Sequence, residues 1–165
     1  MSPERPCPVL VLGFGNRSRG DDALGPLLLD GLSTDLPGNI ELLEDMQLQI
    51  EHAIDLKQRR LALFVDAAIA MSTGFHFGPV HAANDLSHSS HALSPSELLA
   101  NYRRLFGPPP DAFLLAIGGK DFELGSDLSQ EAAQNLDAAL HFCRTQLLTT
   151  LRMEVWLDLS TKKIK

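Results

Sequence analysis

The most constraining feature of the chain is a stretch near its start where a short apolar run leads, through glycines, to two adjacent carboxylates. Residues 9–12 are apolar, half of them β-branched, and too few for a helix, which predicts a buried strand. Gly13 and a second glycine two residues later are expected to end that strand in a turn. Asp21 and Asp22 then precede an apolar run over residues 24–32 that predicts a helix. Acidic side chains are therefore expected where a parallel strand passes into a helix, which is where open α/β sheets bind ligands.

The remainder of the chain repeats this alternation of strand and helix. Further strands are predicted over residues 40–43, 61–65, 75–80 and 112–117, and further helices over residues 49–56, from Ser94 to Phe106, and after Ser129. The alternation predicts a three-layer α/β/α sandwich with a five-stranded, mostly parallel twisted sheet. Pro79 cannot donate to a central ladder, so its strand is expected at a sheet edge. Residues 1–165 are interpreted as one domain, and the tail after about residue 152 has no assignment.

Composition excludes several classes of protein. No apolar run approaches the roughly 20 residues of a membrane span, and the N-terminus MSPERPCP lacks the pattern of a secretion signal. The net charge of −7 repels phosphate backbones, so neither a nucleic acid nor a membrane is an expected partner. Cys7 and Cys143 provide no disulfide framework and no zinc spacing, which favours a cytoplasmic location.

Three side chains that are remote in sequence are expected to meet at one edge of the sheet. Right-handed crossovers place the first and third strands side by side, so Asp22 and Asp66 would open on the same crevice. Taken singly, Asp66 can cap a turn over residues 67–70, Asp22 can favour a helix N-terminus, and His91 can be an ordinary loop histidine. Taken together, two carboxylates and an imidazole suit nickel, zinc or manganese and leave positions open for a substrate.

Four segments carry a resemblance to a known family. They are GFGNRSRGDDALGP at residues 13–26, FVDAA at 64–68, SSHALSPSELL at 89–99 and FELGSDLS at 122–129. In this order and spacing they resemble the hydrogenase maturation endopeptidases, and they span most of the chain. The resemblance implies an endopeptidase that removes the C-terminal extension from the nickel-loaded large-subunit precursor of a [NiFe]-hydrogenase, as the last step of maturation.

The same resemblance implies roles for individual residues. Asp22, Asp66 and His91 would be the catalytic and metal-contacting residues, with nickel supplied by the substrate and with zinc or cadmium able to substitute. The neighbouring Asp21 is expected to shape the loop instead. One departure is the segment DMQLQ at residues 45–49, where many relatives carry a glycine-rich D-G-G-T segment. It leaves the substrate hydrogenase open, with a hint of the cytoplasmic NAD-reducing enzymes.

Two other functions remain open at the level of sequence. A nucleotide-binding module is suggested by Gly13-Phe14-Gly15 after a strand and by Glu44 after the next one, but Ser18 replaces the third glycine and two aspartates would confront a pyrophosphate. A non-catalytic chaperone that senses nickel or holds the large subunit would use the same three ligands. Nothing supports a serine or cysteine nucleophile, since Ser18 has no evident base and Cys7 lies before the first strand.

Overall fold

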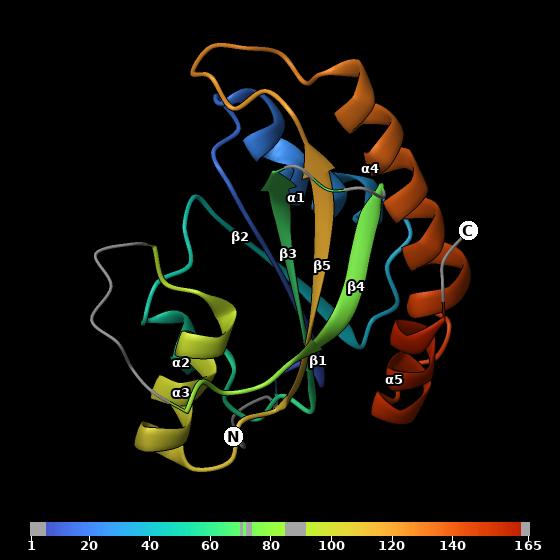
Figure 1. The fold of residues 1–165 in the computed structure, drawn as a ribbon. Helices are drawn as coiled ribbons and strands as arrows, with labels where there is room; N and C mark the ends of the chain where they lie inside the picture. Colours follow the sequence, from blue (N-terminus) through green and yellow to red (C-terminus); the bar gives the residue numbers. More distant parts are fainter. Residues whose placement is uncertain (1–5, 70, 72–73, 85–91, 163–165) are drawn as a thin grey trace.

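The sheet of this protein has five strands, and all but one of them run parallel. The computed structural model describes residues 6–69, 71, 74–84 and 92–162, so His91 lies outside the described residues. The strands are β1 (Val9–Phe14), β2 (Ile40–Asp45), β3 (Leu61–Ile69), β4 (Phe75–Val80) and β5 (Asp111–Gly119). Their order is β2-β1-β3-β5-β4, with β4 antiparallel at one edge (Figure 1). The mostly parallel sheet, the edge position of β4 and the contact between β1 and β3 are thus confirmed.

Helices cover both faces of the sheet, which gives the predicted three layers (Figure 1). One face carries α2 (His52–Asp55) and α3 (Pro95–Phe106), and the other carries α1 (Leu24–Leu32), α4 (Gln130–Phe142) and α5 (Met153–Thr161). A 3-10 turn, η1 (Gly20–Ala23), leads into α1, and a π-helical turn, η2 (Cys143–Leu147), follows α4. Within the described ranges, no helix combines the length and the apolar character needed to cross a membrane.

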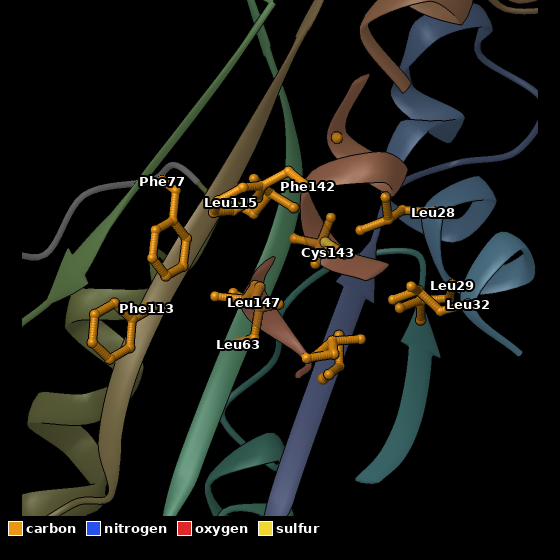
Figure 2. Packing of buried hydrophobic residues seen from close by; sticks show 14 of the residues in the cluster. Leu28, Leu29, Leu32, Leu63, Phe77, Phe113, Leu115, Phe142, Cys143 and Leu147 are labelled. Carbon is orange, nitrogen blue, oxygen red and sulfur yellow. The ribbon is translucent and has the colours of Figure 1, made fainter. Parts of the chain in front are cut away.

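The core consists of two apolar clusters, one on each side of the sheet, because successive strand residues point to opposite faces. Figure 2 shows the larger cluster, in which Leu115 from β5 lies near Phe142 from α4 and Leu63 from β3 lies near Leu147 from η2. Trp156, the single tryptophan, is fully buried in the same cluster and stacks edge-on against Phe113. The tail that has no assignment from the sequence therefore forms α5 and completes the core.

The expected boundaries were wrong at two places that matter for the site. Gly13 does not end β1 in a turn but lies inside the strand, where a Cβ atom would come within 2.8 Å of the Leu29 side chain and 2.9 Å of the Gly25 carbonyl oxygen. Glycine is needed there because α1 packs directly against the strand. β3 does not end at Asp66 but continues to Ile69 beside β5, so Asp66 does not cap a turn at the residues that follow it.

Candidate functional site

A pocket of about 440 Å³ opens where β1 and β3 end, on the side of the sheet that carries α2 and α3. Two carboxylates, Asp22 from η1 and Asp66 from β3, belong to its wall. The remaining lining residues are Phe14, Gly15, Asn16, Arg19, Met46, Gln47, Leu48, Ala92, Leu93, Ser94 and Pro95. The pocket therefore lies at the predicted edge of the sheet, and it brings together two of the three predicted site residues.

The loop after β1 folds back tightly to present Asp22. Gly15 has a φ of 151°, and a Cβ atom at this position would lie only 1.9 Å from the backbone oxygen of Asp22. The N–H of Asn16 donates to Asp22 Oδ2 over 2.7 Å. Asp22 is thus oriented by backbone geometry, and among the described residues no other group donates a hydrogen bond to its carboxylate.

Asp21, the neighbouring aspartate, has a structural role, as predicted. It is fully buried, and its carboxylate accepts hydrogen bonds from the N–H groups of Lys120, Asp121 and Ser129 and from the Ser129 hydroxyl, over 2.6–2.9 Å. Burial by itself would raise the pKa of Asp21, but these hydrogen bonds outweigh it and hold the pKa below its ordinary value. Asp21 therefore ties η1 to the loop between β5 and α4.

Asp66 has the most perturbed carboxyl group of the pocket. Burial raises its pKa to about 7, against the opposing effect of the Ala67 N–H, which donates to Oδ1 over 2.8 Å, and the negative charge of Asp22 raises it further. The electrostatic coupling of Asp66 to Asp22 means that the two carboxylates are close enough to repel each other. A cation between them would relieve that repulsion, so the donor chemistry fits a divalent metal ion.

The wall formed by residues 46–48 is held in place by a buried histidine. His52 is only 6% exposed, and its Nδ1 accepts a hydrogen bond from the Gln49 N–H over 2.8 Å. Its Nε2 lies 3.2 Å from Asp45 Oδ2 at the end of β2. The neutral tautomer with hydrogen on Nε2 satisfies both contacts. His52 thus braces one wall of the pocket, a role that no local sequence pattern indicates.

Arg17, in the loop after β1, anchors that loop to α1 and β2 from outside the pocket. Its two terminal nitrogens each lie 2.8 Å from an oxygen of Asp30 on α1, and its Nε lies 3.1 Å from both carboxylate oxygens of Glu44 on β2. Arg17 Nη2 also contacts Glu44 Oε1. Glu44 is therefore occupied by an arginine, which bears on the nucleotide-binding alternative.

The third predicted ligand, His91, falls outside the described residues. The residue that follows it, Ala92, lines the pocket. In the part of the chain that the structure describes, no three His, Cys, Asp or Glu side chains are grouped so that they could hold a metal ion. Asp22 and Asp66 could provide at most two ligands, so a metal ion at this site would need further ligands from His91 or from a substrate.

The protein is thus an α/β protein with paired carboxylates in a pocket at its strand ends, the edge at which open α/β sheets bind their ligands. Within this class, the chain has the fold of the hydrogenase maturation endopeptidases. It superposes on hydrogenase maturating endopeptidase HybD from E. coli with a TM-score of 0.67 and 21% identity, over 88% of this chain and 93% of that one.

Structures from archaea agree with this comparison. The [NiFe] hydrogenase maturation protease HycI from Thermococcus kodakarensis matches with a TM-score of 0.67 and 19% identity, over 87% of this chain and 94% of that one. A hydrogenase 2 maturation peptidase from a thaumarchaeon matches with a TM-score of 0.62 and 22% identity, over 84% and 97%. No protein-family model and no curated protein sequence matches the chain. Identities at this level establish a shared fold and no more.

Proposed function

We propose that this chain is a hydrogenase maturation endopeptidase that removes the C-terminal extension of a nickel-loaded [NiFe]-hydrogenase large-subunit precursor. The observation that carries the proposal is the pair of carboxylates, Asp22 and Asp66, in one pocket at the strand ends. The shared fold with proteins that are named as hydrogenase maturation endopeptidases supports it, as do the four sequence segments that resemble that family.

In this proposal the pocket recognises nickel that the substrate already carries. Asp22 and Asp66 would contact the ion together with His91, and the cysteines of the substrate would supply its other ligands. Borderline divalent ions accept such mixed oxygen, nitrogen and sulfur ligands, so zinc or cadmium can replace nickel. By holding the ion, Asp22 and Asp66 would fix the register of the scissile bond, and the bound ion would supply Lewis acidity toward a carbonyl group or a water molecule. The raised pKa of Asp66 means that its carboxyl must give up a proton before it binds the ion.

The nucleotide-binding alternative is less well supported. A dinucleotide at the β1 turn would place its pyrophosphate beside Asp22 and Asp66, and no anion is favoured there. Glu44, the candidate for a ribose hydroxyl, is engaged by Arg17. Equilibrium dialysis with NAD separates the two functions, and tight binding would favour the nucleotide.

The decisive experiment mixes the purified protein with the nickel-loaded precursor and measures the mass of the precursor. We expect the wild type to shorten it at the C-terminus, and the Asp66→Ala variant to remain folded but leave it intact. The Asp137→Ala variant, altered at an exposed carboxylate on α4, is the matched control and should behave as the wild type. Binding without a mass change would favour the chaperone, and normal processing by Asp66→Ala would overturn the assignment of the site.

The proposal extends to the cellular location of the protein and to the choice of substrate hydrogenase. The two free cysteines, Cys7 and Cys143, accord with a reducing, cytoplasmic setting. The segment at residues 45–49 forms the turn at the pocket wall and is the part that differs from many relatives. Precursors of several hydrogenases, including an NAD-reducing enzyme, should therefore be compared as substrates.

A further inference from the structure

A row of three residues crosses the sheet at the level of Asp66. Asp66 on β3 pairs with Ala116 on β5, and Ala116 pairs with His76 on the edge strand β4. Paired residues on neighbouring strands point to the same face of a sheet. Phe77, the next residue of β4, packs in the cluster on the α1 and α4 side, so His76 points to the opposite side. Asp66 and His76 thus share the face that carries the pocket.

The surface between these two side chains is open. His76 is exposed and Ala116 is partly exposed, so within the described residues solvent reaches this row of the sheet. Neighbouring strands are about 4.8 Å apart, which puts the backbones of Asp66 and His76 about 10 Å apart. In the next row on the same face, the partly exposed Ala68 pairs with Gly118, which is buried.

The imidazole of His76 lies over Gly78 of the same strand, where a Cβ atom would come within 3.1 Å of its Cε1. Among the described residues, none forms a hydrogen bond or an ion pair with its imidazole, and its position on an edge strand leaves it accessible. A neutral imidazole offers one donor and one acceptor, which suits contact with a polypeptide backbone or a polar side chain. β5 fills the space of about 10 Å between these two backbones, so a polypeptide bound between the two side chains would lie on the face of the sheet, over Ala116.

We propose that His76 is a substrate-binding residue, and that it hydrogen-bonds the polypeptide lying across Ala116 while the scissile bond lies at Asp66. This inference rests on the proposed endopeptidase function and extends the site across β5 to β4. The pocket beside Asp22 would then hold the metal-bearing part of the substrate. The methyl group of Ala116 would form the floor under the segment next to the cleavage site.

The test measures KM and kcat for the nickel-loaded precursor with His76→Ala, His76→Gln and Ala116→Leu. We expect His76→Ala to raise KM about tenfold with little change in kcat, as for the loss of one hydrogen bond. His76→Gln retains a donor and an acceptor and should restore most of the affinity. Ala116→Leu removes no contact but obstructs the surface, so it should also raise KM. His141→Ala, an exposed histidine on α4, is the matched control.

A second measurement does not depend on cleavage. A synthetic peptide that spans the cleavage site of the precursor should shift the imidazole resonance of His76 in NMR spectra, and leave that of His141 unchanged. If the wild type cleaves while His76→Ala keeps the wild-type KM and the resonance does not move, the role of His76 is overturned and the proposed function stands. If the wild type does not cleave the precursor, the proposed function fails and the inference fails with it.

Discussion

At the scale of single residues, the two site carboxylates were predictable and their supports were not. Asp22 lies in the turn after β1 and Asp66 directly follows the apolar part of β3, so the pairing of these two strands brings both carboxylates to one edge of the sheet. The partners of Asp21 lie 99 to 108 residues away, and nothing local in the sequence indicates them. The same holds for His52, whose burial depends on how the loop after β2 folds back over it.

Asp66 is expected to lower the stability of the protein at neutral and alkaline pH. Its pKa is about 7 in the folded protein against an ordinary value of 3.8, so between these values the folded state holds a proton that the unfolded state has lost. The free energy of unfolding therefore falls as pH rises through this interval. Asp66→Asn removes that fall, so the variant should be more stable than the wild type by about 2 kcal/mol at pH ~8. This is about half of the free energy that the full pKa difference would give, because the carboxyl group keeps some contact with water.

The measurement is urea unfolding followed by the fluorescence of Trp156 at about pH 4 and about pH 8. The two proteins should be nearly equal in stability at the lower pH, where the folded wild type carries the proton and roughly half of the unfolded molecules carry it too. Asp137→Asn, at an exposed carboxylate of α4, should match the wild type at both. If the wild type were as stable as Asp66→Asn at the higher pH, the pKa of Asp66 would not be raised in the folded protein.

Asp21 should act on stability in the opposite direction. Because its pKa is lowered in the folded state, its contribution is present above the ordinary pKa of an aspartate and is lost as pH falls below it. Asp21→Asn replaces a carboxylate that accepts four hydrogen bonds with an amide whose NH2 group would face N–H and O–H donors. The free energy of unfolding should therefore fall by about 2–3 kcal/mol at neutral pH. Unfolding in urea at neutral pH and near pH 3 should show this difference shrinking with acid.

At the scale of elements, local patterns predicted which segments are strands and helices, but contacts between segments decided where they end. The capping box at Ser94 and Glu97 marks the start of α3, and it forms as predicted. β3 runs three residues past Asp66 because β5 continues beside it as far as Gly119. α5 has no comparable start signal, since Arg152 at its N-cap makes no side-chain hydrogen bond, and Trp156 reveals its role only within the assembled core.

The contact of α1 with β1 depends on a missing side chain. At Gly13 a Cβ atom would press against Leu29 and against the backbone oxygen of Gly25, and the second of these cannot move without shifting the helix. Gly13→Ala should therefore lower the free energy of unfolding by about 1–3 kcal/mol, as for other overpacked sites. Gly38, where a Cβ atom would meet nothing within 4 Å, gives the matched control Gly38→Ala. Equal stabilities of the two variants in urea would contradict the close approach.

At the scale of the whole molecule, the two thiols should report separately on the surface and on the core. Cys143 is fully buried between α4 and the sheet, and burial raises the pKa of its thiol to about 12 (Figure 2). Cys7 is partly exposed. Because thiolates are the reacting species, a thiol reagent near pH 8 should label Cys7 alone in the native protein, and both Cys7 and Cys143 in concentrated urea. Rapid labelling of Cys143 without denaturant would indicate a loosely closed core.

The antiparallel edge strand β4 also affects how copies of the protein meet in concentrated solution. An unpaired strand edge is a template for further strands, and a run of free backbone donors and acceptors invites another chain to extend the sheet. β4 has only six residues, and Pro79 among them has no N–H to offer. A neighbouring copy would find a short and interrupted template there, so amyloid-like stacking along this side is disfavoured.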